Sequence, residues 1–253
     1  MAHLAPTSTT STGLPDTASP LALRIGSVVA LTMTAVTVGT FALALMAGAD
    51  DSPYPFTSDV IAAQWPGDYL WMYPAMLLML LFVVVIAAVH EYAPADRKIF
   101  SLVGVCLAVI AAAVLLITYF IQVTVMQPSL EKGQLDGWAM LTMYNPNGVF
   151  IALEELGFLL MSLALAVLAP VFRQRNKVER TIRWLFVACF ALAVGALAAV
   201  SATRGIDRGV FFEISVISIV WSTLIVAGPL LAVVLRREPA ESTSASPVTE
   251  DGA

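Results

Sequence analysis

Six long apolar runs constrain the fold of this 253-residue chain more than any other feature. Each run approaches or exceeds the roughly 20 residues that a helix needs to cross the hydrocarbon core of a bilayer. Lipid offers no partner for an unpaired backbone amide, so each run is expected to be helical despite its many Val, Ile and Thr residues. A β-barrel would instead show strands of about 10 residues with alternating polarity. The runs are Ile25–Ala47, Tyr69–Val89, Ile99–Val125, Val149–Val171, Trp184–Ala202 and Val210–Leu235.

The composition supports the same class. Hydrophobic residues make up 59 % of the chain and charged residues only 12 %, whereas soluble domains carry roughly 25 % charged residues. The sequence therefore predicts an all-α, multi-pass membrane protein, a bundle of six transmembrane helices over residues 24–236. Segments 1–23 and 237–253 are rich in small and polar residues and are predicted to be disordered tails. The abundance of Ala and Val favours a bacterial origin.

The distribution of Lys and Arg predicts how the bundle is oriented. The side that holds both termini carries Arg24, Arg97, Lys98, Arg173, Arg175, Lys177, Arg180, Arg183, Arg236 and Arg237. The opposite side carries only Lys132, Arg204 and Arg208, and its first loop has four Asp residues and no base. Positively charged loops stay on the cytoplasmic side. We therefore expect a protein of the cell membrane whose N and C termini are both cytoplasmic.

The connection between the third and fourth apolar runs has a pattern of its own. Apolar residues recur there at spacings of three and four among polar ones, at Leu130, Leu135, Trp138, Leu141 and Met143. This pattern predicts a short amphipathic helix lying on the outer surface. Such a helix serves either as a lid over a cavity or as an interfacial loop resting on lipid. Asn145 is then expected to be the N-cap of the fourth helix, with Pro146 at its first position.

Two successive acids, Glu154 and Glu155, lie about two turns inside the fourth apolar run. At 1.5 Å per residue they would lie roughly 10 Å below the outer end of this helix. A charge at this depth costs several kcal/mol, so acids inside a membrane are candidates for function by default. The two side chains project about 100° apart and therefore flank one broad face of the helix.

Other polar residues of the outer half are the expected partners of these acids. Tyr119 and Gln122 share one face of the third helix, and Asn147 stands just above the acids. Arg204, at the outer end of the fifth helix, is expected to supply the counter-charge. Glu213 is expected to be mainly structural, one turn from the outer end of the sixth helix, and to reach water or pair with Arg208. The cluster is interpreted either as a pocket for a small cation, a proton or an amphiphile, or as a buried network that fixes the register of the bundle.

The remaining features narrow the choice of function without deciding it. The common catalytic signatures are absent from the sequence, and no residue is assigned a catalytic role. Cys106 and Cys189 without a nearby His make a poor metal site and are interpreted as packing residues, so no metal or cofactor is predicted. The basic loops are explained by orientation and contact with lipid headgroups, so nucleic acid is not an expected partner.

Three functional hypotheses fit the sequence. The first is a small transporter or an ion- or proton-binding protein that uses the outer polar cluster. The second is a structural or partner-binding membrane subunit, as a homo-oligomer or a hetero-oligomer. The third and weakest is a membrane enzyme acting on lipid, because the chain offers acids but neither a nucleophile nor a metal set.

Overall fold

The computed structural model describes residues 19–47 and 64–236, and within these ranges the chain forms helices joined by turns, without a strand. Most of both predicted tails, as well as residues 48–63 of the first outer loop, lie outside the described residues. The elements are α1 (Pro20–Ala47), η1 (Gly67–Tyr69), α3 (Met72–Tyr92), η2 (Ala95–Arg97), α4 (Lys98–Ile121), η3 (Gln122–Met126), α5 (Gln127–Glu131), α6 (Trp138–Leu141), α7 (Val149–Leu168), η4 (Ala169–Val171), α8 (Lys177–Arg204) and α9 (Phe211–Arg236).

Six of these helices, α1, α3, α4, α7, α8 and α9, are long and apolar enough to cross a membrane. The prediction of an all-α bundle of six transmembrane helices is thereby confirmed. The helices follow the predicted runs within a few residues, except that two of them begin earlier. Both early starts have local causes in the sequence.

Polar caps explain the two early starts. The backbone N–H of Ala22 donates to the Ser19 hydroxyl over 3.5 Å, and Pro20 occupies the first helical position, where its missing N–H is not needed. At α8 the Asn176 side chain accepts the N–H of Glu179 at 3.0 Å and caps the helix. In α8 a polar first turn therefore precedes the apolar part of the helix, whereas α1 simply extends its apolar run back to the capped Pro20.

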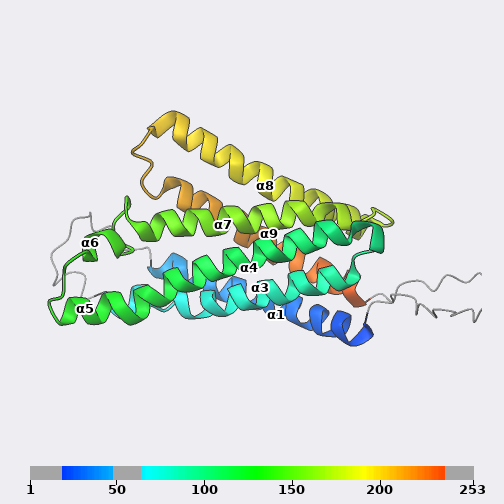
Figure 1. Cartoon of the computed structure of the whole chain (residues 1–253), viewed down its shortest axis with the longest axis horizontal. Helices are drawn as coiled ribbons and strands as arrows, with labels where there is room; N and C mark the ends of the chain where they lie inside the picture. The colour runs from blue at the N-terminus through cyan, green and yellow to red at the C-terminus, as the bar shows by residue number, and fades with distance from the viewer. Residues whose placement is uncertain (1–18, 48–63, 237–253) are drawn as a thin grey trace, which may run out of the picture.

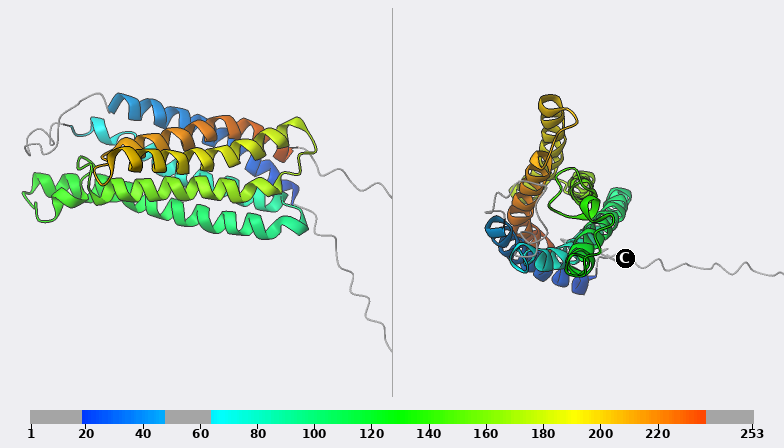
Figure 2. Two further views of the ribbon diagram at one scale, coloured as in Figure 1. Left: turned by 90° about the horizontal axis from the view of Figure 1, so that it is seen from above. Right: turned by 90° about the vertical axis from the view of Figure 1, so that its left-hand side faces the viewer.

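The six helices lie side by side along the long axis of the molecule (Figure 1). α1 packs against α3 and α9, α4 against α3 and α7, and α8 against α7 and α9. The terminal end of the bundle is the one where α1 begins and α9 ends. The cap end is the opposite one, where η1, α5, α6 and the 205–210 loop lie. α8 stands at the edge of the bundle when the molecule is seen end-on (Figure 2).

Glycines allow two of the helix pairs to approach closely. A Cβ added to Gly228 of α9 would lie 2.0 Å from Thr34 Oγ1 and 2.7 Å from the Ala30 carbonyl oxygen of α1. A Cβ on Gly157 of α7 would lie 2.5 Å from Leu115 Cγ of α4. Small residues at such seams are the usual means of helix association in lipid, where burying a large apolar side chain gains little.

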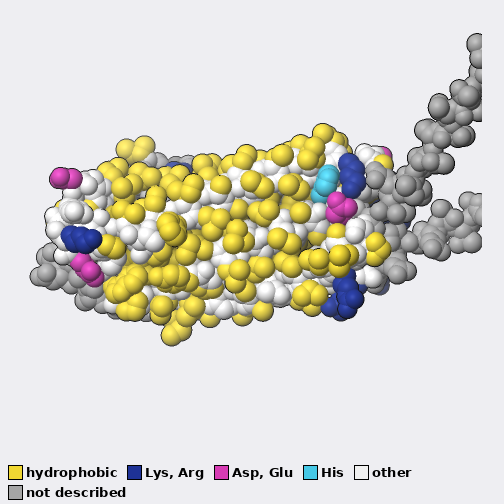
Figure 3. Space-filling model, turned by 60° about the horizontal axis from the view of Figure 1, so that its bottom comes forward, with side chains coloured by type: hydrophobic (Ala, Val, Ile, Leu, Met, Phe, Trp, Pro, Cys, Tyr) yellow, Lys and Arg dark blue, Asp and Glu magenta, His cyan; other side chains and the backbone are white. Residues whose placement is uncertain are grey.

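The outer surface of the bundle matches a lipid environment. Apolar side chains cover the middle of the face drawn in Figure 3, and charged side chains on this face gather at its two ends. Large apolar residues such as Leu80, Ile117 and Leu192 are more than half exposed in the isolated chain. In a soluble protein a surface of this kind would drive association, whereas in a bilayer it contacts lipid.

The connection between α4 and α7 differs from the single amphipathic helix that the sequence predicts. α4 continues through the π-helical turn η3 into α5, and α6 is a separate turn after Gly133 and Gly137, whose φ angles of 67° and 75° are left-handed. Two such glycines break the helix that the apolar spacing alone would favour. α7 then begins at Val149 with Gly148 as its N-cap, so the prediction of Asn145 as N-cap is wrong.

Candidate functional site

Glu154 lies on the face of α7 that packs against the other helices and is almost wholly buried, with 1 % of its surface exposed. Tyr119 of α4, itself fully buried, donates its hydroxyl proton to Glu154 Oε1 over 2.6 Å. A hydrogen bond to an acid in a medium of low dielectric constant is short and strong. The predicted proximity of Tyr119 and Glu154 is therefore present in the structure.

The second partner of Glu154 is Glu213, from the first turn of α9. The two carboxyl groups are hydrogen-bonded to each other, and Glu213 is also buried. A carboxylate can only accept a hydrogen bond, so this contact requires a proton on one of the two acids. We call Glu154 and Glu213 the acid pair.

Glu213 lies on the packed face of α9, opposite the serines of the same helix. Ser215 and Ser218 are half-buried and Ser222 is exposed, whereas Glu213, Val216 and Val220 are buried in the bundle. The expectation that Glu213 turns to water or pairs with Arg208 is wrong, because the packing of α9 against α7 directs it to Glu154.

Glu155 lies beside the acid pair and has a different partner. Its Oε2 accepts a hydrogen bond from Arg208 Nη2 over 3.2 Å, and these groups form an ion pair. The expected counter-charge, Arg204, instead lies with its guanidinium 3.5 Å from the ring centroid of Phe211. Arg204 ends α8 and is exposed, whereas Arg208 is four residues further along the turn that leads back to α9. The 205–210 turn therefore selects the arginine that reaches α7.

Gln122, the other predicted partner, is the first residue of η3 directly after α4. It is buried, but it bonds to the segment above the acid pair. Its amide nitrogen donates to the Leu141 carbonyl over 2.7 Å, and its amide oxygen accepts the Met143 N–H at 3.1 Å. The Trp138 indole N–H donates to the Met126 carbonyl over 3.1 Å. We call residues 127–148 the cap. One turn of α4 separates Gln122 from Tyr119, so the cap is attached directly above the acid pair.

Further hydrogen bonds give the cap its shape. The Asn145 side chain donates to the Ala139 carbonyl over 2.7 Å and accepts the Asn147 N–H at 3.0 Å. The Tyr144 hydroxyl donates to Asp68 over 3.1 Å, and burial, with the nearby Tyr69 and Asp68, raises the pKa of Tyr144 above its ordinary value. Asn147 itself is exposed at the end of the cap and does not belong to the buried cluster.

Aromatic rings pack against Tyr119, the partner of Glu154, and continue into the bundle. Trp71, the N-cap residue of α3, packs edge-on against Tyr119, with ring centroids 5.3 Å apart, and against Trp221 of α9 at 6.4 Å. Trp221 also contacts Phe41 of α1 and Phe158 of α7, at 5.4 Å and 6.0 Å. Phe158 lies one turn beyond Glu154 on the same helix. Further toward the terminal end, Trp221, Phe158 and Phe41 thus form a packed aromatic layer contributed by three helices.

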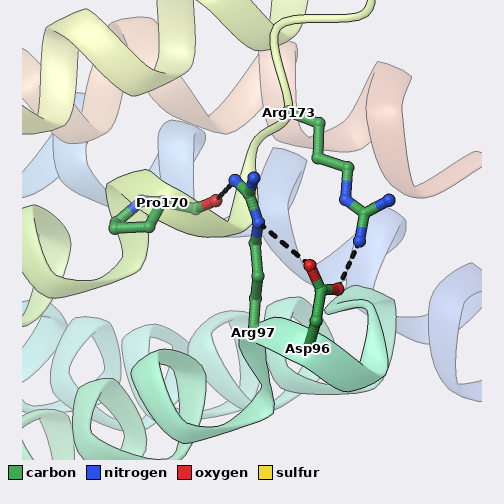
Figure 4. Close-up of polar contacts among 4 residues, drawn as sticks. All are labelled: Asp96, Arg97, Pro170 and Arg173. Carbon is green, nitrogen blue, oxygen red and sulfur yellow. Dashed lines mark hydrogen bonds and ion pairs between the residues drawn. The ribbon is translucent and has the colours of Figure 1, made fainter.

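A second set of polar contacts holds the terminal end together. The Asp96 carboxylate pairs with Arg173 and, at 3.7 Å, with Arg97, and Arg97 donates to the Pro170 carbonyl (Figure 4). These contacts join the turn between α3 and α4 to the turn after α7. Arg173 and Asp96 are partly exposed. We call the contacts of Asp96, Arg97 and Arg173 the clamp. Because they tie two loops together at the end of the bundle, we assign the clamp a structural role.

The structure places the other reactive side chains apart from the acid pair. Cys189 is buried, whereas Cys106 is exposed, and both are free thiols. Among the described residues there is no group of His, Cys, Asp and Glu that could hold a metal ion. No family model, curated protein or solved structure matches the chain. The acid pair and its neighbours are therefore the strongest indication of function.

Proposed function

We propose that the chain is a proton-binding protein of the cell membrane, working as a small transporter or ion-binding protein, with the acid pair as its binding site. The juxtaposition of two buried acids, Glu154 bonded to Tyr119 and in contact with Glu213, carries this proposal. It joins two transmembrane helices through one proton, which makes their contact depend on protonation. Acids inside a membrane are expensive, and in pumps and transporters they form proton relays.

The charges around the pair support a proton or another small monovalent cation as the ligand. With one shared proton the acid pair keeps one negative charge, while Arg208 neutralises the charge of Glu155. An uncompensated buried charge is unfavourable, so binding of a second proton would relieve it. Glu154 and Tyr119 are too deeply buried to contact a bulky amphiphile in this conformation. A proton, in contrast, binds directly to a carboxylate oxygen and needs no cavity of its own.

The proposed orientation puts the acid pair in the outer half of the membrane. The terminal end carries the Asp96, Arg97 and Arg173 clamp, and positively charged loops face the cytoplasm. Both termini would then be cytoplasmic and the cap extracytoplasmic. Labelling of a cysteine introduced at exposed Glu131 of the cap with a membrane-impermeant thiol reagent on intact cells tests this; protection of that site would reverse the orientation.

Infrared spectroscopy of the purified protein in lipid nanodiscs tests proton binding. The C=O stretch of a buried protonated carboxyl should appear and change with pH, and it should be lost in both Glu154→Gln and Glu213→Gln. Glu131→Gln removes an exposed carboxyl and is the matched control. Tyr119→Phe keeps both acids, and it should shift the band rather than remove it. A band that persists unchanged in both Gln variants, with the fold intact by circular dichroism, would overturn the proposal.

A partner-binding subunit is the second candidate, favoured by the position of α8. In the most apolar stretch of α8 only 17 % of the residues are buried, against 50 % in the corresponding stretches of α3, α7 and α9. Ala191, Gly195 and Ala199 are exposed at spacings of four, and a Cβ on Gly195 would meet no atom within 4 Å. Such a face suits close helix association. Gly195→Leu should then abolish cross-linking to a partner; unaltered cross-linking excludes this face as the interface.

A further inference from the structure

Exposure is lowest at the acid pair and rises toward the loop at the cap end. Glu154 is 1 % exposed, Glu213 8 % and Glu155 9 %, while the side chain of Arg208 is 36 % exposed. The three acids can each bind a proton, whereas Arg208 keeps its charge. Glu155, the neighbour of Glu154 in α7, and its ion-pair partner Arg208 therefore lead from the acid pair to the exposed loop at the cap end.

Among the residues that the structure describes, no comparable series leads from the acid pair toward the terminal end. α7 carries no ionisable residue from Leu156 to Leu168, on the order of 20 Å of apolar helix. Over the same depth α9 contributes Val216, Val220 and Leu224 to the core. Of the described residues of α1, α3, α4 and α8, the only buried ionisable group in this interval is the Cys189 thiol.

Three buried hydroxyl groups in this interval bond to carbonyls of their own helices. Ser162 donates to the Leu159 carbonyl over 2.7 Å, Thr223 to Ile219 over 2.8 Å and Thr37 to Met33 over 2.7 Å. The indole N–H of Trp221 is buried without an acceptor among the described residues, but an indole only donates and cannot take up a proton. The aromatic layer around Trp221 thus ends the series of groups that could carry a proton.

We propose, resting on the proton-binding function proposed for the acid pair, that this pair exchanges protons with the cap-end face alone, through Glu155 and Arg208. A proton passes from water to the Glu155 carboxylate when Arg208 moves aside, and from Glu155 to the acid pair, with Arg208 charged throughout. The protonation of the pair, and with it the contact between α7 and α9, then depends on the pH of one side of the membrane. The site is a one-sided pH sensor or the outward-facing state of a transporter.

The groups that face the acid pair fit this role. Tyr119 of α4 donates to Glu154, Glu155 follows Glu154 in α7, and its partner Arg208 belongs to the loop after α8. Trp71, the N-cap residue of α3, places its ring next to Tyr119. The Tyr144 hydroxyl donates to Asp68, and the Tyr144 ring packs edge-on against Tyr69. Within the described residues α1 contributes an aromatic ring and hydroxyls at this depth, without an acid or a base.

The test uses full-length protein in liposomes, sorted for a single orientation by an affinity tag at the C-terminus. The pH is stepped on one face at a time while the carboxyl C=O band is recorded. A step on the cap-end face should change the band, and the same step on the terminal-end face should leave it unchanged. An equal response to both faces would overturn one-sided access while leaving proton binding intact, whereas absence of the band overturns proton binding itself.

Two variants then test the route. Glu155→Gln should slow hydrogen–deuterium exchange of the protonated carboxyl on the order of 100-fold, the usual contribution of a positioned proton-transfer group, while the band at equilibrium remains. Asp207→Asn, an exposed acid in the same loop as Arg208, is the matched control and should exchange at the rate of the unaltered protein. Exchange in Glu155→Gln at that same rate would exclude Glu155 as the entry point.

Discussion

Replacing Gly228 by Ala should separate α1 from α9 and destabilise the bundle. The added Cβ would lie 2.0 Å from Thr34 Oγ1 and 2.7 Å from the Ala30 carbonyl oxygen, whereas unstrained carbon contacts are about 3.5–4.0 Å. Rotating Thr34 relieves only the first clash and breaks its 3.1 Å hydrogen bond to Ala30. The second clash is with backbone, so the two helices must move apart by roughly 1 Å.

The size of the effect reflects two opposing contributions. Overpacking of a tight interface costs about 1–3 kcal/mol, and Ala gains about 1 kcal/mol over Gly in helix propensity. Because the obstacle is backbone, the upper half of the overpacking range applies, and the free energy of unfolding should fall by about 1–2 kcal/mol.

The assay is reversible unfolding in mixed micelles, with Gly195→Ala as the matched control. A Cβ at position 195 would meet no atom within 4 Å, so this variant keeps the propensity gain without a clash and should be neutral or slightly stabilising. Equal stability of the two variants would refute the assignment of Gly228 to a close seam between α1 and α9.

The remaining predictions concern the cap and the polar cluster. Gln122→Ala should free the cap, because it removes both amide bonds to residues 141 and 143; hydrogen exchange should rise across 138–147, and not in the exposed control Gln134→Ala. Tyr119→Phe should lower the free energy of unfolding by about 1.5–3 kcal/mol, the usual value for a hydrogen bond to a charged group. A change below about 0.5 kcal/mol would argue against the 2.6 Å contact of Tyr119 with Glu154. Arg208→Gln should destabilise the bundle by about 1–2 kcal/mol, a value between those of exposed and buried ion pairs. Arg204→Gln should cost less than about 1 kcal/mol, because Arg204 contacts the Phe211 ring. The reverse order of the two effects would mean that Arg204 is the partner of Glu155.

Much of the architecture can be predicted from the sequence alone, because lipid requires each backbone amide to be paired within its own helix. This requirement predicts the number of helices and most of their bounds. It also marks Glu154 and Glu155 as unusual, since an acid in an apolar run is costly wherever it lies. The early start of α8, with Asn176 as its N-cap, has a signal in the sequence too, an Asn with Glu179 three residues later.

The partners of the acids depend on tertiary packing. Helical periodicity places Glu213 opposite the serines, but it does not say which of these two faces turns toward the bundle. The packing of α9 against α7 and α1, with Gly228 in close contact with Thr34 and Ala30, sets the rotation of α9 that brings Glu213 to Glu154. Likewise Arg204 and Arg208 are equally basic in the sequence, and only the turn after α8 decides that Arg208 reaches Glu155. Sequence determines which residues are costly in a membrane, whereas the fit between helices decides which of them meet.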